Sequence, residues 1–203
     1  MKITLLLLSF LYLAACTTNP IESNAHQEFV DQQLNYEGLI EANVLEDAVY
    51  DGFYNKFQYK LIMLTTKIVD TQLERQGELF QWDAAKLGSE KDKAHQTMNN
   101  KSEVFVSFFA PEKASSKLDD KRTVWRILLD VGGKRYVGEA KKLSKPVAEL
   151  AVLYPFHDRW SQPYIVSFNV PMALVESNPV KFTITGPVGN STIAVPPTTT
   201  SRP

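Results

Sequence analysis

The chain has 203 residues, of which 44% are hydrophobic and 11% aromatic, and its formal net charge is −1. This apolar content is enough for a sizeable buried core. The balanced charge excludes the strongly basic surface with which proteins hold nucleic acid. Cys16 is the single cysteine, so an internal disulfide bond is excluded.

The first residues are organised like an export signal. Lys2 supplies a positive charge, residues 3–12 form an apolar run, and two alanines precede Cys16. Charge, apolar run and a small-residue cleavage site are the three parts of a secretory signal. The run is shorter than the roughly 20 residues that a helix needs to cross a bilayer. We therefore expect residues 1–15 to be a removable signal peptide.

The sequence Leu13-Ala14-Ala15-Cys16 resembles the lipobox of bacterial lipoproteins. In that family the Cys thiol is joined to diacylglycerol, and the cysteine becomes the first residue of the mature protein. The resemblance covers only the signal and this cysteine, and it implies an acylated Cys16, carrying for example palmitate, with membrane lipid as a partner. Several acyl chains anchor firmly, since each buried methylene contributes about 0.8 kcal/mol.

In that family an Asp after the Cys often marks inner-membrane retention. Thr17 and Thr18 stand there instead, which implies the outer membrane and a periplasm-facing protein.

Composition divides the rest of the chain. Residues 16–25, after the acylated cysteine, are polar and are predicted to form a flexible tether. Residues 196–203 are rich in Pro and Thr, which is typical of a disordered tail. The stretch between them, residues 26–195, is predicted to be a single globular domain, with a helical front (26–101) and a β-rich back (102–195).

The front is predicted to contain two helices and a strand. In residues 29–50 the apolar side chains recur on one helical face, which indicates a helix. Residues 53–64 alternate as a strand with one solvated side, to which Ile62 is assigned. Residues 66–87 favour a helix despite an internal glycine. The charged residues 88–101 indicate a loop.

The back is predicted to consist of short strands separated by turns. Gly132-Gly133 can adopt the positive φ angles of a two-residue hairpin turn. The predicted strand segments lie at 104–109, 125–131, 136–137, 164–170, 182–184 and 193–195. This spacing favours a mainly β fold, an immunoglobulin-like antiparallel sandwich with N-terminal helical additions. The alternative is an α+β fold in which the front helices pack on one sheet.

One segment, from Tyr154 to Tyr164, concentrates aromatic side chains between prolines. Tyr, Trp and Arg are enriched at interface hot spots, and Trp and Tyr also stack on sugar rings. The alternative is that these aromatics plug one end of the core. The candidate partner-binding residues are Tyr154, Phe156, His157, Arg159, Trp160 and Tyr164.

No catalytic motif is present, and we expect neither a cofactor nor a metal. His157 and Asp158 are adjacent, but neighbouring residues of an extended strand point to opposite faces and would not converge. The sequence therefore favours a non-catalytic binding or assembly module for an envelope partner, either a protein or a glycan. The alternatives are a cell-wall or carbohydrate-active enzyme whose residues are scattered in the sequence, and a purely structural spacer.

Overall fold

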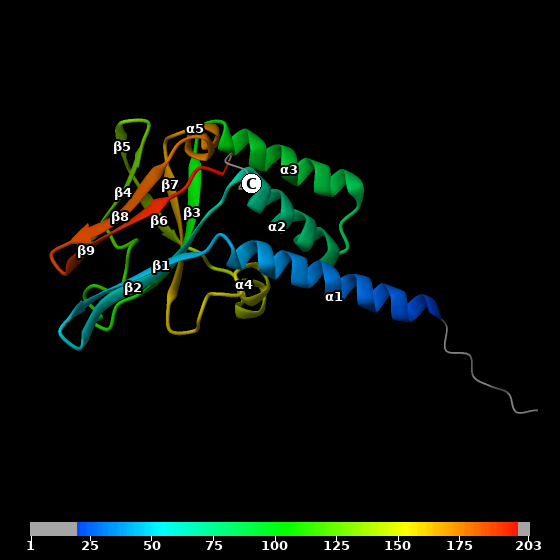
Figure 1. The fold of residues 1–203 in the computed structure, drawn as a ribbon, viewed down its shortest axis with the longest axis horizontal. Coiled ribbons are helices and arrows are strands. Elements are labelled where there is room, and N and C mark those ends of the chain that lie inside the picture. The colour runs from blue at the N-terminus through cyan, green and yellow to red at the C-terminus, as the bar shows by residue number, and fades with distance from the viewer. Residues whose placement is uncertain (1–19, 199–203) are drawn as a thin grey trace, which may run out of the picture. The chain divides into compact units, whose positions relative to one another are not determined.

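The computed structural model describes the backbone of residues 20–198 and the side chains of residues 30–198. The chain divides between Leu34 and Asn35, inside helix α1 (Pro20–Glu41), into two compact units. The described part of the first unit is helical, and the second unit holds both sheets (Figure 1). The predicted signal, the predicted acylation site Cys16 and residues 199–203 of the predicted tail lie outside the described residues.

The second unit contains two antiparallel sheets. The first has five strands in the order β1 (Leu45–Asp51), β2 (Tyr54–Met63), β3 (Ser102–Phe109), β7 (Gln162–Phe168) and β6 (Glu139–Lys142). The second has four strands in the order β5 (Lys134–Val137), β4 (Arg126–Val131), β8 (Val180–Gly186) and β9 (Gly189–Val195). The helices after α1 are α2 (Thr66–Leu79), α3 (Ala84–Met98), α4 (Val147–Leu153) and α5 (Met172–Ser177). The fold is a sandwich with 36% strand and 32% helix, so it combines the predicted sandwich with the helical content of the α+β alternative.

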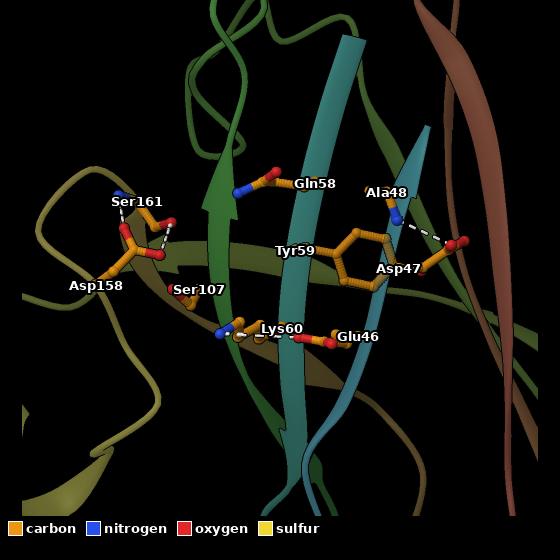
Figure 2. A pocket seen from close by; sticks show the side chains of 9 residues that line it. All are labelled: Glu46, Asp47, Ala48, Gln58, Tyr59, Lys60, Ser107, Asp158 and Ser161. Atoms are coloured by element: carbon orange, nitrogen blue, oxygen red, sulfur yellow. Dashed lines mark hydrogen bonds and ion pairs between the residues drawn. The ribbon is translucent and has the colours of Figure 1, made fainter. Parts of the chain in front are cut away.

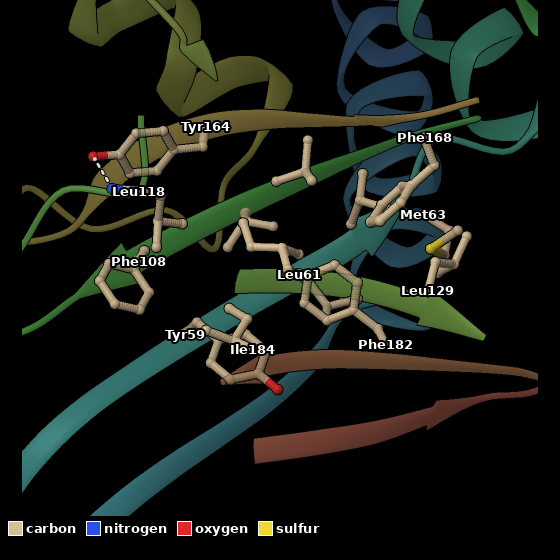
Figure 3. Close-up of a cluster of buried hydrophobic side chains, with 14 of the residues drawn as sticks. Tyr59, Leu61, Met63, Phe108, Leu118, Leu129, Tyr164, Phe168, Phe182 and Ile184 are labelled. Atoms are coloured by element: carbon tan, nitrogen blue, oxygen red, sulfur yellow. Dashed lines mark hydrogen bonds between the residues drawn. The ribbon is translucent and has the colours of Figure 1, made fainter. Parts of the chain in front are cut away.

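The main core lies between the two sheets. Alternate residues of the strands point inward, as the period of two in a strand requires. Leu129 of β4 lies opposite Phe182 of β8, and both are fully buried (Figure 3). Tyr164, Val166 and Phe168 of β7 supply the facing wall, so the predicted core faces of these strands are confirmed.

Two glycine positions shape the sandwich. Gly132 and Gly133 have φ angles of +57° and +75° and form the predicted hairpin turn between β4 and β5. Gly138 links β5 to β6, where the chain passes from one sheet to the other. A Cβ atom at this position would lie 2.6 Å from the Phe168 ring and 2.7 Å from Val166. Only glycine allows so close an approach at this crossing.

A second core lies on the outer face of the five-stranded sheet. The C-terminal part of α1, together with α2 and α4, covers one end of this face, where Ile62 and Phe105 are fully buried. Assigning Ile62 to a solvated side is therefore wrong, because helices far away in sequence cover its position.

The N-terminal half differs from the prediction in four places. The helix predicted over 66–87 is broken, because α2 ends at Leu79 and α3 begins only at Ala84, and Gln81 between them has a φ of +51°, outside the helical region. The helix predicted over 29–50 ends at Glu41, and residues 45–51 form the edge strand β1. The apolar spacing of these residues fits both a helix and a strand, and the hydrogen-bonded pairing with β2 selects the strand. Residues 88–101, predicted as a loop, lie mostly in α3. None of the residues of α3 is buried, so it has no apolar stripe to mark it. Residues 20–25, predicted as tether, form the start of α1.

Candidate functional site

The helices leave the other end of the outer sheet face uncovered. In register, Ile62 pairs with Phe105 under the helices, and Lys60 pairs with Ser107 one row beyond them. A pocket of about 330 Å³ lies on this uncovered part, which we call the polar face (Figure 2). The pocket is lined by Glu46, Asp47 and Ala48 of β1, Gln58, Tyr59 and Lys60 of β2, Ser107 of β3, and Asp158 and Ser161.

Residues 154–161, which we call the aromatic loop, connect α4 to β7 and form one border of the pocket. Asp158 holds the loop closed, because its Oδ1 accepts hydrogen bonds from the backbone N–H groups of Trp160 (2.8 Å) and Ser161 (2.9 Å). Its Oδ2 lies 3.2 Å from the Ser161 hydroxyl, which donates to it (Figure 2). The loop therefore has a fixed conformation at its tip.

Two further contacts fix the loop to the sheet. The Tyr154 ring stacks on Phe105 with ring centroids 3.6 Å apart. The Ser107 hydroxyl and Nδ1 of His157 are hydrogen-bonded at 2.7 Å. The loop is thus fixed at its first residue, at His157 and, through Asp158, at its tip.

The structure separates the six predicted binding residues into three groups. Tyr154 and Tyr164 are buried, and the Tyr164 hydroxyl accepts a hydrogen bond from the Leu118 N–H inside the sandwich (Figure 3). Phe156 and His157 are half-buried. Arg159 and Trp160 are exposed, Trp160 at 70%, and the Arg159 guanidinium lies 5.0 Å from the Trp160 ring centroid. The plug interpretation therefore describes the two tyrosines and does not describe Trp160.

The remaining polar residues of the site are not visible as a motif in the sequence. Glu46 and Lys60 meet only because β1 and β2 pair in this register, with Lys60 Nζ 3.7 Å from Glu46 Oε2. Gln58 and Ser107 reach the same face from two strands more than 40 residues apart. The alternation of β2 places Gln58 and Lys60 on one side of the strand. Which strands pair with β2, and which residues they add to this face, depends on the tertiary structure alone.

The Ser107–His157 pair has the composition of a nucleophile and its base. Ser107 is only 2% exposed, however, and its hydroxyl is already hydrogen-bonded to His157 of the aromatic loop. His157 also packs its ring edge against Phe105, with centroids 5.9 Å apart. The pair therefore acts as an anchor for the aromatic loop.

This anchor depends on pH. Burial lowers the pKa of His157 below its ordinary value of 6.5, and the Asp158 carboxylate partly opposes the shift. The unfolded chain then binds the proton more readily than the folded chain, so folding stability falls as pH drops below about 6.5. We expect an NMR titration to give His157 a midpoint below 6.5, with His157→Gln assigning the signal and reducing the loss of stability from pH 7.5 to about 5.5. A midpoint at or above 6.5 would contradict this expectation.

A second polar cluster lies where the two sheets meet at their edges. The Tyr59 hydroxyl and Ser191 Oγ of β9 lie 2.7 Å apart, and Ser191 also donates to Asp47 of β1. Burial raises the pKa of Tyr59 to about 12, so its hydroxyl keeps its proton. The cluster ties β1 to β9 and occupies the Asp47 carboxylate.

Within the described residues, no group of three or more His, Cys, Asp or Glu side chains could hold a metal ion. Among the same residues, no helix combines the length and the apolar character that crossing a membrane requires. Comparisons with protein-family models, with curated proteins and with solved structures found no match to this chain.

Proposed function

We propose that this chain is a lipid-anchored, non-catalytic binding module of a bacterial envelope, and that it captures its partner at the polar face beside the aromatic loop. The observation that carries the binding part is the exposed Trp160, with Arg159 stacked on it, on a loop fixed at three points. Large aromatic and Arg side chains supply much of the binding energy at interfaces. A loop that is already fixed loses little entropy on binding.

The location is a separate part of the proposal. It rests on the resemblance of residues 13–16 to a lipobox, with Cys16 as the lipidated residue and membrane lipid as a partner. The threonines after Cys16 favour the outer membrane, with the domain facing the periplasm.

The hydrolytic alternative has less support in the pocket. Glycoside hydrolysis requires two carboxyl groups that are free to act on the substrate. Asp158 accepts hydrogen bonds at both oxygens, from Trp160 and Ser161, and Asp47 accepts them from Ala48 and Ser191. Both carboxylates thus serve the protein's own structure, and Glu46 is the one lining carboxylate directed to the pocket and to Lys60.

The test uses a photo-crosslinking amino acid in intact cells. Placed at position 160, it should capture the partner. Placed at position 147, where Val147 is 78% exposed at the start of α4, it should not. In a chain with the crosslinker at 160, Arg159→Ala should weaken capture by roughly 1–4 kcal/mol, the range of a hot spot. The same substitution should leave the melting temperature unchanged because the side chain is exposed. Equal capture at positions 160 and 147, or capture that Arg159→Ala does not reduce, would contradict the binding role.

A further inference from the structure

The polar face has an unusual order of side chains. Its centre is occupied by Glu46, Gln58 and Lys60, which are charged or polar and partly exposed. Its border at the aromatic loop carries an exposed aromatic residue, Trp160, which is 70% exposed.

This order is the reverse of a protein–protein interface. Such interfaces have an apolar centre from which charged residues are depleted, and a polar rim. A partner protein would cover the Glu46 and Lys60 charges with the apolar centre of its own interface. Removing these charges from water costs free energy unless the partner pairs both of them again. The centre of the face therefore suits a ligand that is itself hydrated and rich in hydroxyl and amide groups.

The hydrogen-bonding groups at the centre also match such a ligand. Gln58 accepts a hydrogen bond from Asn55 Nδ2 at Oε1 (2.7 Å), which leaves its own N–H groups as donors. Lys60 adds ammonium donors, and Glu46 adds acceptors. At 3.7 Å these two form a loose pair, with exposed side-chain fractions of 38% and 70%, so a ligand hydroxyl group can bind between them. One positive and one negative charge favour a ligand without strong net charge.

The aromatic border at Trp160 supplies the other half of saccharide recognition. A pyranose ring has an apolar C–H face, and a Trp or Tyr ring offers a flat apolar surface with a negative face on which it can stack. β1 and β3 lie about 10 Å apart across β2, since neighbouring strands are about 4.8 Å apart. The aromatic loop, which carries Trp160, leads into β7 on the far side of β3, so the face is wide enough for more than one sugar unit.

We propose that the polar face binds the glycan strand of the cell wall, with N-acetylated sugar units over Gln58 and Lys60 and one ring stacked on Trp160. This inference rests on the proposed function, which places the domain next to the cell wall. Acetamide groups on the sugars complement the Gln58 amide, and the strand requires no strongly charged site.

The experiment measures binding of the full chain, purified in detergent, to two probes. One is cell-wall sacculi freed of protein by protease, assayed by co-sedimentation. The other is chitohexaose, a soluble chain of N-acetylglucosamine, assayed by calorimetry. We expect both to bind, Trp160→Ala to weaken binding about 10-fold, and Gln58→Ala to weaken it by a similar or smaller factor. Two substitutions are the matched controls and should bind like the unmodified chain: Trp82→Ala, a half-buried residue in the connection between α2 and α3, and Gln96→Ala, an exposed residue of α3.

The outcomes separate this inference from the proposed function. The glycan site would be overturned if the unmodified chain bound neither probe. It would also be overturned if Trp160→Ala and Gln58→Ala left the binding unchanged. If the crosslinker at position 160 then captured a protein in cells, the binding function would stand with a different occupant. If it captured nothing beyond the control at position 147, the proposed function would fail as well.

Discussion

Replacing Leu129 by alanine is expected to destabilise the domain by about 2–5 kcal/mol. Leu129 is fully buried between the sheets, opposite Phe182, and its truncation removes apolar contacts from both sheets at once. The two sheets enclose the site on both sides, so neighbouring side chains cannot collapse fully into the cavity. Domains of this size are typically stable by about 5–15 kcal/mol, so the loss would be a large part of the total.

Leu128 provides a matched control for this prediction. It is the same residue type on the same strand, but it points to the opposite face of the sheet and is only half-buried. Leu128→Ala should cost about 1 kcal/mol, because part of its surface already contacts water in the folded state. Urea denaturation of both variants measures the difference. A cost for Leu129→Ala no larger than for Leu128→Ala would show that the inter-sheet core is assigned to the wrong face.

Cys16→Ala is expected to abolish lipid attachment. In the proposed lipoprotein the thiol is the site of acylation, and the chain has no second cysteine to replace it. Because firm membrane binding requires more than one acyl chain, loss of the modified residue should either leave unprocessed precursor or release soluble protein if cleavage occurs elsewhere.

Labelling cells with a radioactive fatty acid measures this effect. The unmodified chain should take up label and Cys16→Ala should take up none. Thr17→Ala, which changes the next residue and keeps the thiol, serves as the control and should be labelled normally. Equal labelling of the unmodified chain and Cys16→Ala would exclude Cys16 as the anchor.

The sequence by itself determined the features that depend on local chemistry. The alternation of apolar residues in 125–131 and 164–170 predicted the strands and their buried faces, because a strand that packs on one side needs every second residue to be apolar. Gly132-Gly133 predicted its hairpin turn because the turn requires positive φ angles. The density of aromatic and Arg side chains in 154–164 singled out the segment that borders the pocket.

The helical front could not be read in the same way. Residues 45–51 satisfy a helical and a strand periodicity together, and only pairing with β2 decides between them. In α3 no residue is buried, so the apolar stripe by which helices are recognised is missing. This helix is held instead through α2, by the Lys91–Glu74 ion pair and the His95–Asp70 hydrogen bond.

Only the tertiary structure decided what the aromatic segment does. Tyr154 and Trp160 are both aromatic residues of one short loop, yet Tyr154 stacks on Phe105 in the core and Trp160 faces solvent. The difference arises because α4 and β3 cover the first residue, while the Asp158 hydrogen bonds turn the later ones outward. The polar face likewise exists only through strand register, which brings Glu46, Lys60 and Ser107 into one row from three separate segments. It remains open because the covering helices end one row earlier. Sequence periodicity fixes which side of a strand a residue occupies, and long-range packing fixes what lies above it.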